Sequence, residues 1–261
     1  MSTLLRSVLS LLILASLCAP RRAAAEKPVA RKLPAFNQRM VPGNACGPAA
    51  LLNALRFGDA FWQNGLKGVE GDTDRQRLAF VIRAYGGRPS TRLAGRPRWS
   101  PAGINLTDLN DLADDLLAPR GLPALKCATL VPDNGQDLQK FLKSTHRRLV
   151  ASLERGFPPV ISLRRFVWRK TAGGQSAWLA TAAHYVTVTR IQDNLPRGDR
   201  SFTVTYLDPN GGRRCSGTLR LSDAPSPPGL VAAFPATPVG RKKLKDGETT
   251  VLVLSAVLGR W

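Results

Sequence analysis

The pattern of this chain changes at residues 156–159. Before this point apolar residues recur at helical spacing, and after it they alternate with polar residues or form short β-prone runs. Gly156 is a typical helix end, and Pro158 and Pro159 prevent the helix from continuing. Helices in the first part and antiparallel strands in the second predict an α+β fold in which the two kinds of element form separate layers.

Three helices are predicted before the boundary, followed by a helical stretch that leads up to it. The first covers residues 46–57. The second begins near Thr73, which together with Gln76 has the spacing of a capping box. The third is capped by Thr107, and residues 136–155 have helical character over most of their length.

Four strands are predicted after the boundary. Residues 160–163 form a short β-prone run, residues 185–189 and 202–206 alternate with period two, and residues 249–257 form a last candidate. The two alternating segments can pair as a hairpin across the polar loop 191–201. That pairing would bring His184, which precedes residues 185–189, next to Asp208, which lies just past residues 202–206.

Cys46 opens the first predicted helix and is the candidate nucleophile. The positive end of a helix favours a thiolate over a thiol, and Pro48 suits a first helical turn. Leu51, Leu52 and Leu55 can bury the helix in a core, so the thiol would lie on a rigid element. The alternative is a buried cysteine that acts only as a small apolar side chain.

The chain has two histidines, and one of them has a possible acidic partner. His184 directly precedes the predicted strand 185–189, and Asp208 ends the next one. A carboxylate in this position can orient an imidazole and stabilise its cation. His146 lies in a charged helical stretch, and we expect it at the surface. The alternatives are a histidine satisfied by its neighbours and an Asp-Pro-Asn-Gly turn without a catalytic role.

Nucleophilic catalysis requires a nucleophile, a base and a group that orients the base. Cys46, His184 and Asp208 supply these types in that order. Gln38 is a candidate donor to the oxyanion, together with the backbone N–H of Cys46. We expect neither a metal nor a cofactor.

The charge of the chain favours acidic partners. Its 38 Lys and Arg residues outnumber 18 Asp and Glu residues, which gives a net charge of +20. Such an excess favours nucleic acid, anionic lipid or an acidic surface or polymer. The alternative, which we prefer, is a soluble protein whose arginine content reflects codon usage, because the Arg residues are spread along the chain. The sequence has no RNP motif, zinc-finger spacing or basic zipper, so we expect no specific nucleic-acid partner.

Residues 1–25 have the features of a secretory signal peptide. Arg6 provides a positive start, an apolar run extends from Val8 to Cys18, and small residues end at Ala25. The run is too short to cross a bilayer comfortably, and no other segment predicts a membrane span. We expect cleavage near Ala25 and a secreted or periplasmic mature chain, with an extended lead at residues 26–36 and one domain at residues 37–261.

Three cysteines remain in the predicted mature chain. They are Cys46, Cys127 and Cys215, and an odd number in a secreted protein indicates a free thiol. A disulfide between Cys127 and Cys215 would leave Cys46 free. The sequence leaves open whether these two residues lie within bridging distance.

Four motifs occur in a characteristic order. They are Asn-Ala-Cys-Gly-Pro around Cys46, Gly-Phe-Pro-Pro-Val-Ile from Gly156, His-Tyr-Val-Thr-Val from His184, and Leu-Asp-Pro-Asn-Gly-Gly around Asp208. Together they resemble the papain-like cysteine peptidases of the bacteriocin-processing (double-glycine leader) type, and especially their stand-alone relatives.

This resemblance implies a papain-like fold with N-terminal helices packed on a C-terminal antiparallel sheet. It implies that Cys46 is the nucleophile, His184 the base and Asp208 the orienting acid. Gln38 takes the oxyanion role, although its interval to Cys46 is longer than in papain-like enzymes.

The implied function is a secreted thiol hydrolase, a cysteine peptidase or amidase, that acts on a peptide or protein substrate through an acyl-enzyme. One alternative is a transglutaminase-like acyltransferase, which uses the same order of residues. The other is a non-enzymatic secreted binding module on the same fold.

Overall fold

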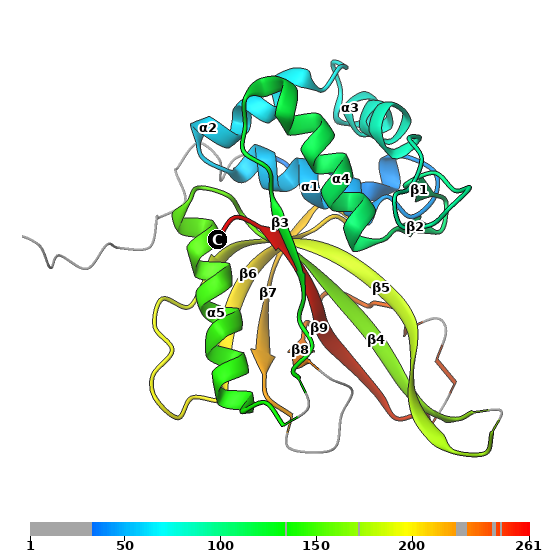
Figure 1. Cartoon of the computed structure of the whole chain (residues 1–261), viewed down its shortest axis with the longest axis vertical. Helices are drawn as coiled ribbons and strands as arrows, with labels where there is room; N and C mark the ends of the chain where they lie inside the picture. Colours follow the sequence, from blue (N-terminus) through cyan, green and yellow to red (C-terminus); the bar gives the residue numbers. More distant parts are fainter. Residues whose placement is uncertain (1–32, 134, 172, 223–228, 242–243, 246) are drawn as a thin grey trace, which may run out of the picture.

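The computed structural model describes residues 33–261 except residues 134, 172, 223–228, 242–243 and 246. The predicted signal peptide lies outside the described residues, and only residues 33–36 of the predicted lead are described. Most of the helices gather at one end of a body built of strands, and the longest helix runs along its side (Figure 1).

The described helices include α-helices and short 3-10 or π turns. They are η2 (Gln38–Met40), α1 (Cys46–Phe57), α2 (Ala60–Gln63), η3 (Asn64–Gly68), α3 (Asp74–Val81), η4 (Ile82–Gly86), α4 (Leu106–Leu117), η5 (Ala118–Arg120) and α5 (Leu138–Glu154). The strands are β1 (Trp99–Ser100), β2 (Gly103–Ile104), β3 (Lys126–Thr129), β4 (Val160–Lys170), β5 (Ser176–Ile191), β6 (Ser201–Asp208), β7 (Arg213–Arg220), β8 (Leu230–Ala233) and β9 (Thr250–Gly259).

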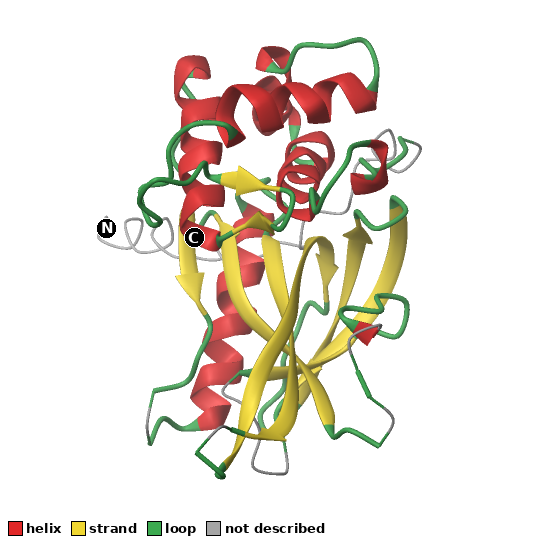
Figure 2. Ribbon diagram, turned by 90° about the vertical axis from the view of Figure 1, so that its right-hand side faces the viewer, coloured by secondary structure: helices red, strands yellow, loops and turns green. Residues whose placement is uncertain are grey.

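The predicted α+β fold of papain-like type is wrong. Six antiparallel strands form a closed barrel in the order β9-β4-β5-β6-β7-β8, and β8 pairs back with β9. The N-terminal helices therefore cover one end of a barrel and are not packed as a layer on a sheet (Figure 2). Closure depends on the short strand β8, whose Leu230 and Val231 pair with Leu254 and Val253. Alternation within a strand predicts the strand but not such a distant partner.

Strand β5 lies between two cores, which explains why residues 185–188 are buried on both of its faces. Val186 and Val188 point into the barrel core. Tyr185 belongs to the core around α1, and the Thr187 hydroxyl donates to the Ala50 carbonyl oxygen at 2.7 Å. These contacts hold α1 against the outside of β5.

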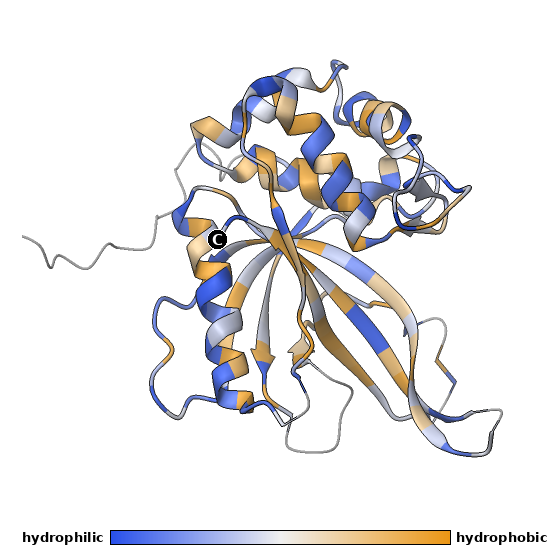
Figure 3. Cartoon of the chain, in the orientation of Figure 1, coloured by the Kyte–Doolittle hydropathy of each residue, from blue (hydrophilic) through white to orange (hydrophobic). Residues whose placement is uncertain are grey.

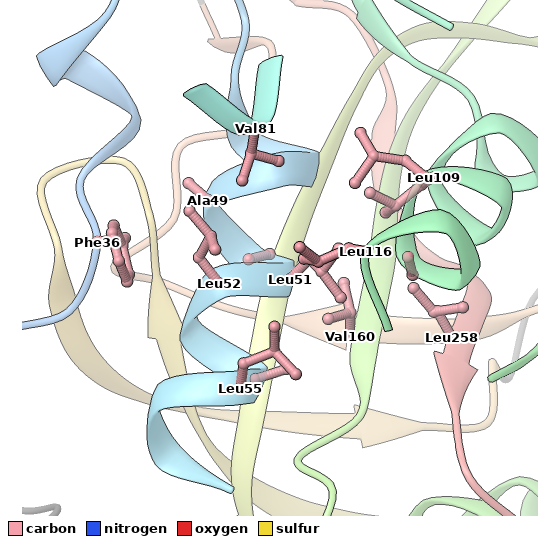
Figure 4. Close-up of a cluster of buried hydrophobic side chains, with 14 of the residues drawn as sticks. Phe36, Ala49, Leu51, Leu52, Leu55, Val81, Leu109, Leu116, Val160 and Leu258 are labelled. Carbon is pink, nitrogen blue, oxygen red and sulfur yellow. The ribbon is translucent and has the colours of Figure 1, made fainter. Parts of the chain in front are cut away.

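Helix α1 is buried along its whole length. Leu51, Leu52 and Leu55 pack in one cluster with Leu109 of α4 and Val160 of β4 (Figure 4). Burial of several leucines at about 25 cal/mol per Å² of apolar surface makes this cluster a large stabilising contribution. The helix that begins at Cys46 is therefore a rigid element.

The predicted helices agree with the structure except in their details. Helix α1 has the predicted bounds, and the capping box of Thr73 and Gln76 is formed at the start of α3. Helix α4 is capped by Asn105 and not by Thr107, because the Asn105 side chain accepts from the Asp108 N–H at 2.9 Å. Helix α5 is one continuous helix. Apolar and polar residues alternate along it, as expected for a helix with one buried face (Figure 3).

None of the helices in the described part of the chain has the length and hydrophobicity that crossing a membrane requires.

Asn53 connects the N-terminal segment to α1. Its side-chain oxygen accepts from the Phe36 N–H at 2.7 Å, and its amide donates to the Phe36 carbonyl oxygen at 3.3 Å, both fully buried. Replacing Asn53 by Ala is expected to lower the free energy of unfolding by about 2 kcal/mol, because two buried backbone groups lose their partners. Urea denaturation measures this change, with the exposed Lys67→Ala as a control that shifts stability by less than about 0.5 kcal/mol. Equal effects of the two variants would contradict this anchoring role.

Candidate active site

Cys46 is the first residue of α1, and the residues around it fix its position. A Cβ at Gly47 would clash with Ile104 of β2, so the motif requires glycine after the cysteine. Ala45 is the N-cap and offers no side-chain acceptor. No capping side chain therefore competes for the first N–H groups of the helix, which carry its positive partial charge.

The loop before Cys46 is held by the small hairpin of β1 and β2. The Asn44 N–H donates to the Pro101 carbonyl oxygen at 2.9 Å, and the Trp99 indole N–H donates to the Asn44 carbonyl oxygen at 3.0 Å. Gly43 has a φ of +81°, and a Cβ there would meet the backbone of Pro101 at 2.9 Å. This close packing sets the direction in which the chain enters α1.

The predicted hairpin brings His184 to Asp208. Strands β5 and β6 pair with Thr187 opposite Leu207, and the His184 Nε2 lies 2.7 Å from the Asp208 Oδ1. His184 was expected before the strand, but it lies inside β5, which extends back to Ser176. Both side chains are buried.

The carboxylate of Asp208 is held at both oxygens. Oδ1 also accepts from the Asn210 N–H at 2.8 Å, and Oδ2 accepts from the Thr237 hydroxyl at 2.8 Å. Burial opposes the negative charge, but the hydrogen bond and charge of His184 and the other donors outweigh it and lower the pKa of Asp208. The Arg213 Nη2 lies 3.8 Å from Oδ2 and adds a more distant positive charge.

The partners of His184 favour its protonated form. Burial lowers its pKa, but the hydrogen bond with Asp208 and the interaction with Cys46 outweigh burial and raise the pKa to about 9. Asp208 engages Nε2, which leaves Nδ1 as the nitrogen available to Cys46. The structure thus brings together the three residues that the sequence analysis selected.

Gln38 lies beside the turn that follows Asp208. Its N–H donates to the Pro209 carbonyl oxygen at 2.8 Å, and the neighbouring Arg39 Nε donates to the Asn210 Oδ1 at 2.8 Å. Gly212 has a φ of +64°, and a Cβ there would meet the backbone of this N-terminal segment at 2.9 Å. The segment is therefore packed tightly against the turn.

The backbone of Gln38 is hydrogen-bonded, whereas its side chain is held less firmly. Its Oε1 is buried and has no hydrogen-bond partner among the described residues. No hydrogen bond within the described ranges joins its amide to Cys46 or His184. Gln38 is thus near the site by its backbone, and its role as an oxyanion donor stays a prediction.

A cavity of about 250 Å³ opens beside His184. Asn44, the strand segment 182–184 and the loop residues 237–240 form its walls. The wall residues Ala182, Ala183 and Gly240 are small, which leaves space next to the imidazole. The cavity gives access to His184, while Cys46 is not among its lining residues.

His146 is not the surface residue that we expected. It is buried, its Nε2 lies 2.8 Å from the Gln192 carbonyl oxygen, and its ring packs edge-on against Phe202. It lines a larger cavity of about 580 Å³ between α5 and residues 193–195, which contains none of the predicted site residues. The charged residues next to it in the sequence predicted a solvent-exposed position, but His146 lies on the face of α5 that packs against the barrel.

Cys127 and Cys215 are both free and form no disulfide. Burial, with the nearby charges of Asp111 and Asp114, raises the pKa of Cys127. Burial and the charge of Asp208 raise the pKa of Cys215. Across the described ranges, no group of three or more His, Cys, Asp or Glu side chains is arranged to hold a metal ion.

Thr237 was missed by the sequence analysis. It lies 29 residues after Asp208, in an irregular segment between β8 and β9. A threonine in such a segment has no spacing or periodicity that would connect it to the site.

No family model matches the sequence, and neither the curated proteins nor the solved structures contain a match to it.

Proposed function

We propose that this chain is a thiol hydrolase that cleaves peptide or amide bonds through an acyl-enzyme. One observation carries the proposal: His184 is hydrogen-bonded to buried Asp208 on one side and interacts with Cys46 on the other. This arrangement supplies a nucleophile, a proton donor and a group that stabilises the imidazolium. The resemblance of the motifs at Cys46, His184 and Asp208 to those of bacteriocin-processing peptidases also supports it.

In the proposed reaction, the Cys46 thiolate attacks the carbonyl carbon and forms a tetrahedral intermediate. The backbone N–H of Cys46 at the start of α1 and the Gln38 amide donate to the oxyanion. His184 donates a proton to the leaving nitrogen as the C–N bond breaks, which leaves a thioester on Cys46. Water then attacks the thioester and gives its proton to His184, and the acid product leaves with the thiolate restored.

The proposal includes the compartment and the partner. A chain cleaved near Ala25 would act outside the cytoplasm on a peptide or protein substrate. The net charge of +20 favours retention at an acidic surface or polymer.

The test is cleavage of a mixed peptide library by the mature chain that begins at Glu26, with products mapped by mass spectrometry. Cys46→Ala is expected to reduce cleavage at least about 1,000-fold, because it removes the nucleophile. Cys127→Ala is the matched control and is expected to retain the cleavage rate of the unchanged chain. Absence of cleavage by the unchanged chain, or equal cleavage by Cys46→Ala, would contradict the proposal.

Adding a primary amine to the same experiment shows whether water or an amine accepts the acyl group. Hydrolysis gives free carboxyl termini whether or not the amine is present. Products that carry the amine in preference to water would instead identify an acyltransferase.

A further inference from the structure

We infer that Tyr206 and Thr237 form a hydrogen-bond relay that fixes the orientation of Asp208, and that Thr237 is a positioning residue of the site. This inference rests on the proposed function, since it concerns how the orienting acid is held. The relay connects strand β6 to a loop that also borders the cavity beside His184.

The direction of each hydrogen bond follows from counting protons. An ionised carboxylate only accepts, so the single hydroxyl proton of Thr237 points to the Asp208 Oδ2 at 2.8 Å. The Thr237 oxygen must then accept from the Tyr206 hydroxyl, which lies 2.9 Å away. Burial raises the pKa of Tyr206, so the phenol keeps its proton while His184 titrates.

The relay is rigid because its members are buried and packed. Asp208 and Tyr206 are fully buried and Thr237 is 2 % exposed. The Tyr206 ring packs against Phe234 at a centroid distance of 4.5 Å, and these two aromatic residues belong to the barrel core. Tyr206 and Asp208 are two residues apart on β6 and therefore share one face of the strand.

Thr237 also keeps the Asp208 carboxylate oriented toward His184 and not toward its second positive partner, Arg213. Rotation of the carboxylate toward the half-exposed Arg213, now 3.8 Å from Oδ2, would weaken the hydrogen bond of Oδ1 to His184. Thr237 holds Oδ2 at hydrogen-bond distance and so keeps Oδ1 directed at Nε2. Loss of the Thr237 donor is therefore expected to weaken the His184–Asp208 pair without removing either residue.

The test compares Thr237→Val, which keeps the size of the side chain, with Thr237→Ser, which keeps the hydroxyl. The readout is the pKa of His184 by NMR, which is simple to assign because the chain has two histidines. The titratable and charged groups that face this imidazole among the described residues are Cys46 on α1, Asp208 on β6 and, behind Asp208, Arg213 on β7. Thr237→Val is expected to lower the pKa of His184 by about one unit, and Thr237→Ser to leave it near 9.

A second readout is the alkaline limb of the pH–rate profile for peptide cleavage. We expect it to move to lower pH by about one unit in Thr237→Val and to return in Thr237→Ser. If Thr237→Val does not fold, the experiment uses Tyr206→Phe. This variant removes the hydroxyl that donates to Thr237 and keeps the aromatic ring against Phe234. The relay would be overturned if the pKa of His184 in Thr237→Val, or in Tyr206→Phe where that variant is used, equals its value in the unchanged chain.

Failure of the relay and failure of the proposed function give different results. A titration that responds to Thr237→Val in a chain that cleaves no peptide supports the relay and contradicts only the hydrolase. Cleavage that depends on Cys46, with a His184 titration indifferent to Thr237, contradicts only the relay.

Discussion

At pH 6, iodoacetamide is expected to alkylate Cys46 about 30 times faster than Cys127 or Cys215 in the same chain. An ordinary thiol with a pKa near 8.5 is about 0.3 % thiolate at this pH. Cys46 is in contact with the His184 imidazole and lies at the start of α1, so its sulfur attacks the reagent faster than an isolated thiol does. The pKa values of Cys127 and Cys215 are raised, so these residues are slow internal references.

This comparison separates chemistry from access to the reagent. Cys46 is 4 % exposed while Cys127 is exposed, so access alone would make Cys127 the faster of the two. The rates are measured by quenching at timed intervals and quantifying the modified peptides by mass spectrometry.

His184→Ala is the matched variant for this experiment. It is expected to reduce the Cys46 rate about 30-fold and to leave the Cys127 rate unchanged. Removal of the imidazole opens space beside Cys46, so a slower reaction cannot come from reduced access. Equal Cys46 rates in the two chains would show that no thiolate–imidazolium pair exists, which would remove the basis of the proposed function.

Local patterns predicted the parts of the site that lie on single elements. The apolar run after Cys46 fixed the bounds of α1, and the alternation in 185–189 and 202–206 predicted the pairing that brings His184 to Asp208. These predictions work because a helix or hairpin depends on neighbouring residues in the chain.

Such local patterns could not predict contacts between residues that are far apart in the sequence. Barrel closure needs the four-residue strand β8 to pair with β9 through two of its residues, and Asp208 is supported by Thr237 from an irregular segment. Both depend on where the chain returns in space. The barrel also explains why His184 lies within a long strand, since β5 continues past the end of β6 and pairs there with β4.

Replacing Asp208 by Asn is expected to reduce kcat/KM for a peptide found in the library about 1,000-fold, while the side chain keeps its shape. The loss follows because an amide does not stabilise the imidazolium and can hold the imidazole in the wrong tautomer. The pKa of His184 falls from about 9, since burial then acts with one stabilising partner fewer. The alkaline limb of the pH–rate profile therefore moves to lower pH, which a profile from pH 5 to 10 measures.

The same variant tests the contribution of the pair to stability, and the signs differ for its two members. The pKa of His184 is raised from 6.5 to about 9, so its stabilisation is complete below pH 6.5 and is lost as pH rises through 9. The pKa of Asp208 is lowered from 3.8, so its stabilisation is present above about pH 4 and is lost as pH falls below that value. The stability advantage of the unchanged chain over Asp208→Asn is therefore expected to be largest between about pH 4 and 6.5.

Urea denaturation at pH 5.5 and 10 measures this difference. The net shift of about 2.5 units corresponds to roughly 3 kcal/mol and also contains the effects of burial and Cys46, so we expect a difference of this order at pH 5.5, most of which disappears at pH 10. Asp193→Asn at an exposed position is the control for the loss of one negative charge, and it is expected to change stability by less than about 0.5 kcal/mol at both values. A stability difference between the unchanged chain and Asp208→Asn that is the same at pH 5.5 and 10 would show that His184 is neutral in the folded protein, because a neutral imidazole has no charge to lose over this range.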